Sequence, residues 1–159
     1  MVPPLSNSPT KTLLTALLSV ITPRRCLSAA IIFFVLMVIL GAIPGEAHAL
    51  SEVVYDKLLH FLAYSVLSGL IYASIIASPV SRALLTVLAV GSLGALDEAI
   101  QTLMPYRDAN WMDWKADMMA SLSCVTLLIF LHVLYSRLGA QARKAPEKRA
   151  SAIARDLSE

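Results

Sequence analysis

Four long apolar runs separated by short polar segments dominate this sequence. They cover residues 26–43, 58–78, 83–104 and 117–136. A bilayer core is about 30 Å thick, so a helix needs about 20 predominantly apolar residues to cross it. Each run is close to that length, and a helix satisfies its own backbone hydrogen bonds in lipid. The sequence therefore predicts an all-α integral membrane bundle of four transmembrane helices.

The composition favours the same class of protein. Hydrophobic residues make up 57% of the 159 residues and charged residues 15%, whereas soluble domains average about 45–50% and about 25%. The two cysteines, Cys26 and Cys124, lie at the start of the first run and inside the last, so we expect no disulfide between them. No cluster of Cys and His has zinc-ligand spacing. We predict no metal, no cofactor and no nucleic-acid partner.

Prolines mark the predicted ends of the first three runs. Pro44 follows the first run, Pro79 the second and Pro105 the third, because proline terminates helices. Only about four residues separate the second and third runs, which predicts a tight antiparallel hairpin. The predicted organisation is an N-terminal segment, a membrane domain and a charged tail, at residues 1–25, 26–136 and 137–159.

The distribution of Lys and Arg predicts the orientation of the helices. If the N-terminus is cytoplasmic, ten of the 13 Lys and Arg residues fall on the cytoplasmic side. The other three, Lys57, Arg107 and Lys115, fall on the outer side. Cytoplasmic loops of membrane proteins carry an excess of Lys and Arg, so we predict an N-in/C-in topology.

The first run has a second interpretation. A basic start, an apolar run and the sequence Ala47-His48-Ala49 are also typical of a secretory signal with cleavage after Ala49. Against this, the 18 residues of the run exceed the usual length of about 7–15 for a signal. Cleavage would leave three spans, and the rest of the topology would be unchanged. Both interpretations stay open here.

Polar side chains gather near the predicted outer ends of the runs. Residues three or four apart are neighbours on a helix, which brings Lys57, His60 and Tyr64 together. Charges within a span usually face a bundle interior or a wet cavity. We therefore predict one polar cluster of nine residues: Lys57, His60, Tyr64, Asp97, Glu98, Gln101, Arg107, Asp113 and Asp117.

This cluster has two interpretations that do not exclude each other. It can be a network of hydrogen bonds and ion pairs that holds the helices together, or a shallow binding or catalytic site at the outer leaflet. In either case Lys57, Arg107 and a protonated His60 are expected to neutralise the carboxylates.

Several single residues have simpler expected roles. Tyr64, Trp111 and Trp114 suit aromatic residues at headgroup depth. Gly91 and Gly94 suit positions at which two helices pack closely.

Together and in this order, the polar motifs resemble those of the VanZ-like family of small bacterial membrane proteins. The motifs are Asp56-Lys57-x-x-His60-x-x-x-Tyr64, Asp97-Glu98-x-x-Gln101, Pro105-x-Arg107 and Asp113-x-x-x-Asp117, and the resemblance runs from about Val35 to Leu134. Two departures are Asp117, where many members have Asn, and Ala120, where many have Gly.

The resemblance implies a bacterial cytoplasmic (inner) membrane protein with a cell-envelope role. The family's namesake is associated with resistance to the glycopeptide teicoplanin. The site roles that the resemblance implies belong to Lys57, His60, Glu98, Gln101, Arg107 and Asp113.

Three functional hypotheses follow. In the first, the outer-face site binds or handles an envelope lipid, a lipid-linked glycan or a glycopeptide, and Lys57 and Arg107 hold phosphate or carboxylate. In the second, the protein is a membrane hydrolase or transferase with His60 as general base and Glu98 as acid, although no recognised catalytic motif is present. A small transporter subunit is the third, which four short helices favour least. The oligomeric state stays open.

Overall fold

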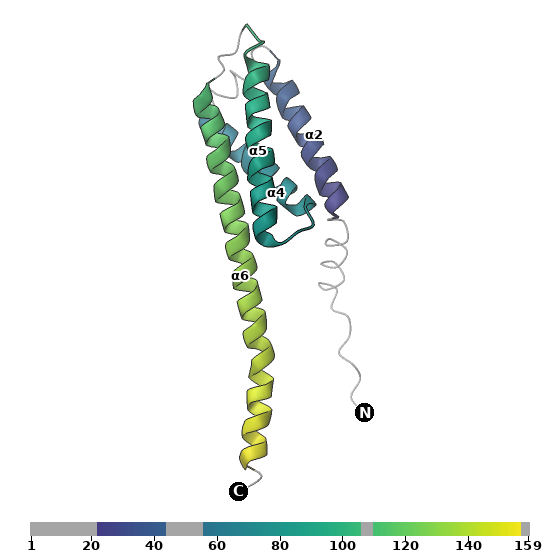
Figure 1. Cartoon of the computed structure of the whole chain (residues 1–159), viewed down its shortest axis with the longest axis vertical. Helices are drawn as coiled ribbons and strands as arrows, with labels where there is room; N and C mark the ends of the chain where they lie inside the picture. Colours follow the sequence, from purple (N-terminus) through teal and green to yellow (C-terminus); the bar gives the residue numbers. More distant parts are fainter. Residues whose placement is uncertain (1–21, 44–55, 106–109, 157–159) are drawn as a thin grey trace. The chain divides into compact units, whose positions relative to one another are not determined.

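The computed structural model describes residues 22–43, 56–105 and 110–156 (Figure 1). These ranges contain four helices and no strand: α2 (Pro23–Gly41), α4 (Asp56–Ser74), α5 (Pro79–Gln101) and α6 (Trp111–Asp156). Each has a segment long and apolar enough to cross a membrane. The prediction of an all-α chain with four such helices is confirmed. Arg107, the cleavage position Ala49 and residues 1–21 lie outside the described ranges.

The chain divides into two compact units, residues 1–125 and residues 126–159. The first unit contains α2, α4, α5 and the beginning of α6. In the second unit, the described residues 126–156 continue as helix, including those predicted as a charged tail. The candidate membrane span in α6 covers Trp111–Gln141. All contacts and sites discussed below belong to the first unit.

Two helices begin earlier in the sequence than predicted, because a residue before each start caps the helix. Pro79 begins α5 instead of ending the preceding run, because the Ser78 hydroxyl accepts the Ser81 backbone N–H at 3.2 Å. Proline is favoured in the first helical turn, where its missing N–H has no partner to lose. Likewise, α6 begins six residues before the predicted 117, because Asn110 Oδ1 accepts the Met112 N–H at 3.0 Å. Hydropathy alone does not reveal such caps.

The predicted hairpin between the second and third runs is confirmed. Residues 75–78 join α4 to α5. The Arg82 guanidinium donates to the Tyr72 carbonyl through Nε at 2.9 Å and Nη2 at 2.6 Å, and it lies 4.1 Å from the centroid of the Tyr72 ring. Because the last carbonyls of a helix have no partner within it, Arg82 satisfies one of them and fixes the turn.

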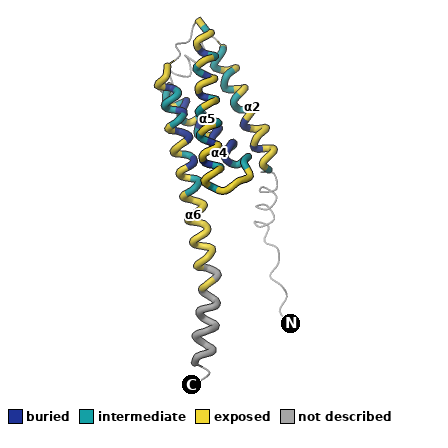
Figure 2. The backbone as a smooth tube through the Cα atoms, in the orientation of Figure 1, coloured by how far each residue is buried: buried dark blue, intermediate teal, exposed yellow. Residues whose placement is uncertain are grey.

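The core of the first unit is built from all four helices. Helix α2 packs on α4, and α4 packs on α5. The buried cluster consists of Ala30, Tyr64, Leu67, Ile71, Val90 and Ala120. Figure 2 shows that buried residues concentrate in this unit, while many residues on the outside of the helices are exposed.

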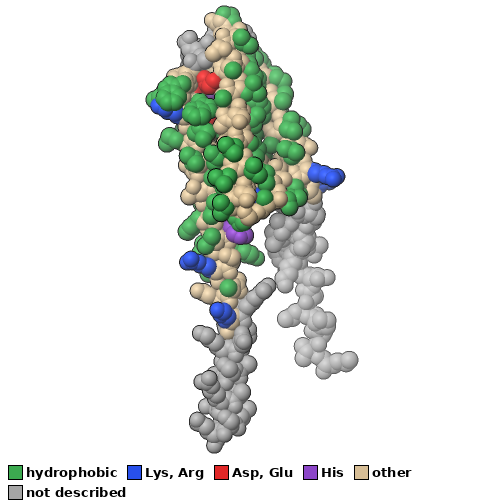
Figure 3. Space-filling model, viewed as in Figure 1, with side chains coloured by type: hydrophobic (Ala, Val, Ile, Leu, Met, Phe, Trp, Pro, Cys, Tyr) green, Lys and Arg blue, Asp and Glu red, His purple; other side chains and the backbone are tan. Residues whose placement is uncertain are grey.

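The outer surface of this unit is strongly apolar. Ile32, Leu84 and Met119 are each about 60% exposed, and Figure 3 shows hydrophobic side chains spread over the visible face. A soluble monomer rarely exposes so large a continuous apolar surface. The apolar helices therefore fit a lipid bilayer as their surroundings.

Candidate functional site

Two polar pairs join α4 to α6. Lys57 Nζ lies 3.1 Å from Asp113 Oδ1, and His60 Nδ1 lies 3.1 Å from Asp117 Oδ1. The spacing of three residues on α4 and four on α6 places the pairs on successive helical turns. The two aspartates and His60 are buried. Lys57 and His60 therefore lie against the Asp113 and Asp117 carboxylates at the start of α6.

Tyr64 extends the polar contacts from α4 to α5. Its hydroxyl donates to Asp97 Oδ2 at 3.3 Å, and its ring stacks on the His60 ring with centroids 6.1 Å apart. Tyr64 is fully buried, so the prediction of an interfacial aromatic residue was wrong. A tyrosine can be withdrawn from the interface when its hydroxyl finds a buried partner, and Asp97 supplies one. Gln101, one turn after Asp97, is also buried.

Two glycines of α5 leave room for side chains of α6. A Cβ added at Gly94 would lie 2.8 Å from Asp117 Oδ2 and 3.2 Å from Trp114 Cδ1. At Gly91, it would lie 3.1 Å from Met118 Sδ. The Trp114 indole N–H also donates to the Gly91 carbonyl at 3.0 Å. Both glycines therefore lie against side chains of α6, and Gly94 makes room for the Asp117 carboxylate. Whether they also allow close approach of two helices stays a prediction.

Glu98 has a different environment from the other carboxylates. Its Oε2 accepts the Asn110 backbone N–H at 2.9 Å. Its Oε1 is buried and has no hydrogen-bond partner among the described residues. Asn110 also caps α6 with its side chain, so Glu98 is tied to the start of that helix.

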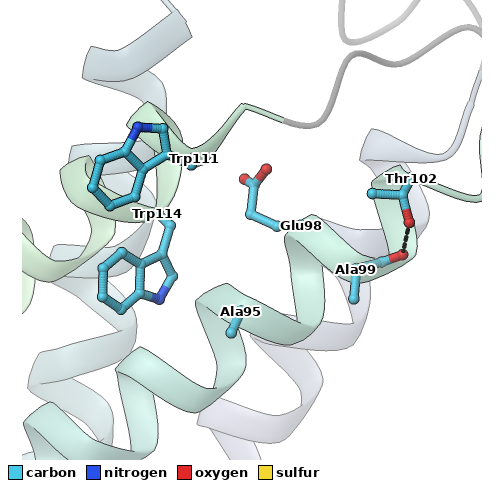
Figure 4. A pocket seen from close by; sticks show the side chains of 6 residues that line it. All are labelled: Ala95, Glu98, Ala99, Thr102, Trp111 and Trp114. Carbon is cyan, nitrogen blue, oxygen red and sulfur yellow. Dashed lines mark hydrogen bonds between the residues drawn. The ribbon is translucent and has the colours of Figure 1, made fainter.

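Glu98 lies in an open pocket of about 360 Å³ between the end of α5 and the start of α6. Figure 4 shows its carboxylate between two indoles from α6 and the last turn of α5, where the Thr102 hydroxyl donates to the Ala99 carbonyl at 2.7 Å. The lining residues are Ala95, Glu98, Ala99, Thr102, Trp111 and Trp114. The pocket is therefore mainly apolar, with one acidic group.

The indole wall of the pocket carries a cation. Trp111 and Trp114 stack with ring centroids 6.4 Å apart. Lys115 Nζ lies 3.7 Å from the centroid of the Trp111 ring and 3.6 Å from Met112 Sδ. Trp111 is 62% exposed, which agrees with a position at the interface. The site combines an acceptor oxygen, aromatic faces and an ammonium group.

Seven of the nine predicted residues fall into two groups. Six form a network of contacts between α4, α5 and α6: Lys57, His60, Tyr64, Asp97, Asp113 and Asp117. The seventh, Glu98, lies in the pocket. Gln101 is buried, and Arg107 lies outside the described residues. Lys57, which we expected to hold an anionic ligand, pairs with Asp113 in the structure.

Sequence reasoning missed the pocket lining apart from Glu98. Ala95, Ala99 and Thr102 follow the spacing of one helical face around Glu98, a signal that was available in the sequence. The two tryptophans were expected only as interfacial residues. Among the described residues, no three His, Cys, Asp or Glu side chains are arranged to hold a metal ion.

Comparisons with known proteins assign no family to the chain. No family model, curated protein or solved structure matches it. A functional assignment therefore depends on the chemistry of the residues described above.

Proposed function

We propose that this chain is a VanZ-like multi-pass protein of a bacterial cytoplasmic membrane, with an N-in/C-in topology. Its outer-face site binds or handles an envelope lipid, a lipid-linked glycan or a glycopeptide. The orientation is supported by the ten of 13 Lys and Arg residues that fall on the side of the termini. The observation that supports binding is an open pocket whose lining includes the Glu98 carboxylate between two indoles.

The Glu98 carboxylate favours a ligand that supplies a donor. An ionised carboxylate only accepts hydrogen bonds, and its one donor among the described residues is the Asn110 backbone N–H. A hydroxyl or amino group of a ligand in the pocket can donate to the carboxylate. Ligand pockets typically have volumes of about 300–1,000 Å³, and the pocket here measures about 360 Å³.

The pocket also suits an amphipathic ligand. Ala95, Ala99 and the indoles offer apolar surface next to the acceptor. The contacts of α4 with α5 and α6 hold together the helices that carry the site. In this proposal the network stabilises the bundle and the Glu98 pocket binds the ligand.

Lipids that co-purify with the protein test this function. The wild type and Glu98→Gln are extracted into nanodiscs together with membrane lipid, and the bound lipids are identified by mass spectrometry. We expect the wild type to enrich one envelope lipid or lipid-linked glycan over the source membrane, and Glu98→Gln to lose that enrichment.

The matched control is Ser92→Ala, an exposed position on the same helix that does not line the pocket. It should keep the enrichment of the wild type. If all three proteins carry lipid in the proportions of the source membrane, the binding function is wrong.

A membrane hydrolase or transferase is the second candidate, and the His60–Asp117 contact favours it. A carboxylate at Nδ1 orients an imidazole that acts as a general base, and the distance here is 3.1 Å. Mass spectrometry of a lipid extract incubated with the protein would detect products. Products that persist with His60→Gln would exclude His60 as the base.

A further inference from the structure

We propose that the Glu98 pocket binds the primary ammonium group of an ethanolamine phospholipid headgroup. This inference rests on the proposed function and names the ligand class of the same site. It depends on the Glu98 carboxylate, on the other acceptor in the pocket, on the indole faces and on Lys115.

Charge favours a cationic group in this pocket. At this end of α4, α5 and α6, the described side chains include four carboxylates, Asp97, Glu98, Asp113 and Asp117. The cations described there are Lys57 and Lys115, together with His60 when it is protonated. An ammonium group adds positive charge and also donates a charge-assisted hydrogen bond to the Glu98 carboxylate, which is stronger than a neutral one.

The acceptors favour a primary ammonium over a quaternary one. A quaternary ammonium has no N–H and cannot donate a hydrogen bond to the Glu98 carboxylate. A primary ammonium has three N–H groups. Thr102 lines the same pocket, and because its hydroxyl donates to the Ala99 carbonyl, its lone pairs remain available as acceptors. Residues four apart on a helix are neighbours, so Glu98 and Thr102 can share one ammonium.

The indoles supply the remaining surface that a cation requires. An ammonium group is attracted to the face of a tryptophan ring within about 6 Å of its centroid. Trp111 already attracts one cation, since Lys115 Nζ lies 3.7 Å from its centroid. Trp111 and Trp114 are stacked with an angle of 17° between their rings, and both line the pocket.

Lys115 favours a ligand whose ammonium is followed by a phosphate. Its partner Met112 Sδ, at 3.6 Å, is a weak acceptor, and a phosphate oxygen is a far stronger one. A phosphoethanolamine headgroup places its ammonium two carbons from its phosphate. Glu98 would therefore bind the ammonium while Lys115 binds the phosphate.

The apolar surroundings favour a lipid as the source of this headgroup. Leu103, just beyond the pocket on the α5 side, is 83% exposed. Met112, between the two tryptophans, is 45% exposed. Such side chains can contact acyl chains, and a soluble amine would leave them without a partner.

Intrinsic fluorescence gives a direct test, because both tryptophans of the chain line the pocket. The purified full chain is reconstituted in a neutral detergent and titrated with phosphatidylethanolamine, phosphatidylcholine or phosphatidylglycerol of identical acyl chains. We expect a saturable change in emission with phosphatidylethanolamine, and an apparent Kd at least tenfold weaker for the other two lipids.

Variants connect the response to the proposed contacts. Glu98→Gln should weaken the apparent Kd for phosphatidylethanolamine at least tenfold, while Ser92→Ala should titrate like the wild type. Circular dichroism reports whether the variants fold. If Glu98→Gln fails to fold, Thr102→Val serves as the test, and it should weaken binding severalfold.

Two results would overturn the inference. One is an equal response to phosphatidylethanolamine and phosphatidylcholine, or an unchanged Kd in the folded pocket variants. The other is a response to soluble phosphoethanolamine at the concentrations at which the lipid acts, which would exclude a lipid source. If a different envelope lipid gives a response that depends on Glu98, the inference is wrong and the proposed function stands. If no lipid gives such a response, the inference is wrong, and the co-purification experiment above decides the proposed function separately.

Discussion

Asp117 shows at the residue scale how much depends on one buried contact. Its side chain is fully buried, its Oδ1 lies 3.1 Å from His60 Nδ1, and its Oδ2 has no hydrogen-bond partner among the described residues. Loss of a partner from a buried polar group costs its desolvation free energy. The His60–Asp117 pair is therefore a stabilising link between α4 and α6.

We predict that His60→Ala lowers the free energy of unfolding by about 1–3 kcal/mol, because Asp117 loses a partner inside the bundle. Denaturation in detergent, followed by circular dichroism, measures this change. Groups in direct contact show non-additive effects. The double variant His60→Ala/Asp117→Ala should therefore lower the free energy of unfolding by less than the sum of the two single variants. Additive losses would contradict the pairing.

At the element scale, the approach of α5 to α6 depends on glycine. Gly94 leaves space that the Asp117 carboxylate and the Trp114 ring occupy. Small residues permit close helix contact in membranes, where packing contributes more to association than the hydrophobic effect does. The same approach brings the indoles of α6 to the pocket beside Glu98.

We predict that Gly94→Ala lowers the free energy of unfolding by about 1–3 kcal/mol, the usual cost of overpacking. Its Cβ would lie 2.8 Å from Asp117 Oδ2, so the carboxylate or the helix must move. Thermal denaturation in detergent measures the change.

Gly69→Ala on α4 is the matched control, since no atom lies within 4 Å of its added Cβ. Alanine is the better helix former by up to about 1 kcal/mol, so this variant should be neutral or stabilising. Equal destabilisation by the two variants would contradict close packing at Gly94.

At the scale of the whole molecule, orientation in the membrane decides which compartment the Glu98 pocket faces. The segment between α5 and α6 adjoins the pocket, and the N-in/C-in proposal places it outside. Both termini then lie in the cytoplasm.

We predict that Ala109→Cys, in a background with Cys26→Ser and Cys124→Ser, reacts with a membrane-impermeant maleimide in intact spheroplasts. Ala152→Cys in the same background should react only after permeabilisation. Lys and Arg are retained on the cytoplasmic side, which is the physical reason for this orientation. Gel shift measures labelling, the cysteine-free protein is the negative control, and the reverse pattern would contradict the topology.

The sequence by itself determined the helical class, the four apolar segments and most members of the polar cluster. Hydropathy and helical spacing are local properties, so Lys57 and His60 could be assigned to neighbouring turns without knowledge of the fold. The helix limits were less accurate, because caps such as Ser78 and Asn110 depend on hydrogen bonds that hydropathy does not report.

Only the tertiary structure decided which side chains meet. In the structure His60 pairs with Asp117, and Tyr64 is buried in the core. Glu98 lines the pocket together with Trp114. Each outcome depends on the rotation and offset of one helix against another. Successive residues of a helix point in directions about 100° apart, since 3.6 residues complete a turn. A small rotation of one helix therefore changes which side chains it contacts. The space that Gly94 leaves for the Asp117 carboxylate and the Trp114 ring fixes the rotation of α5 against α6.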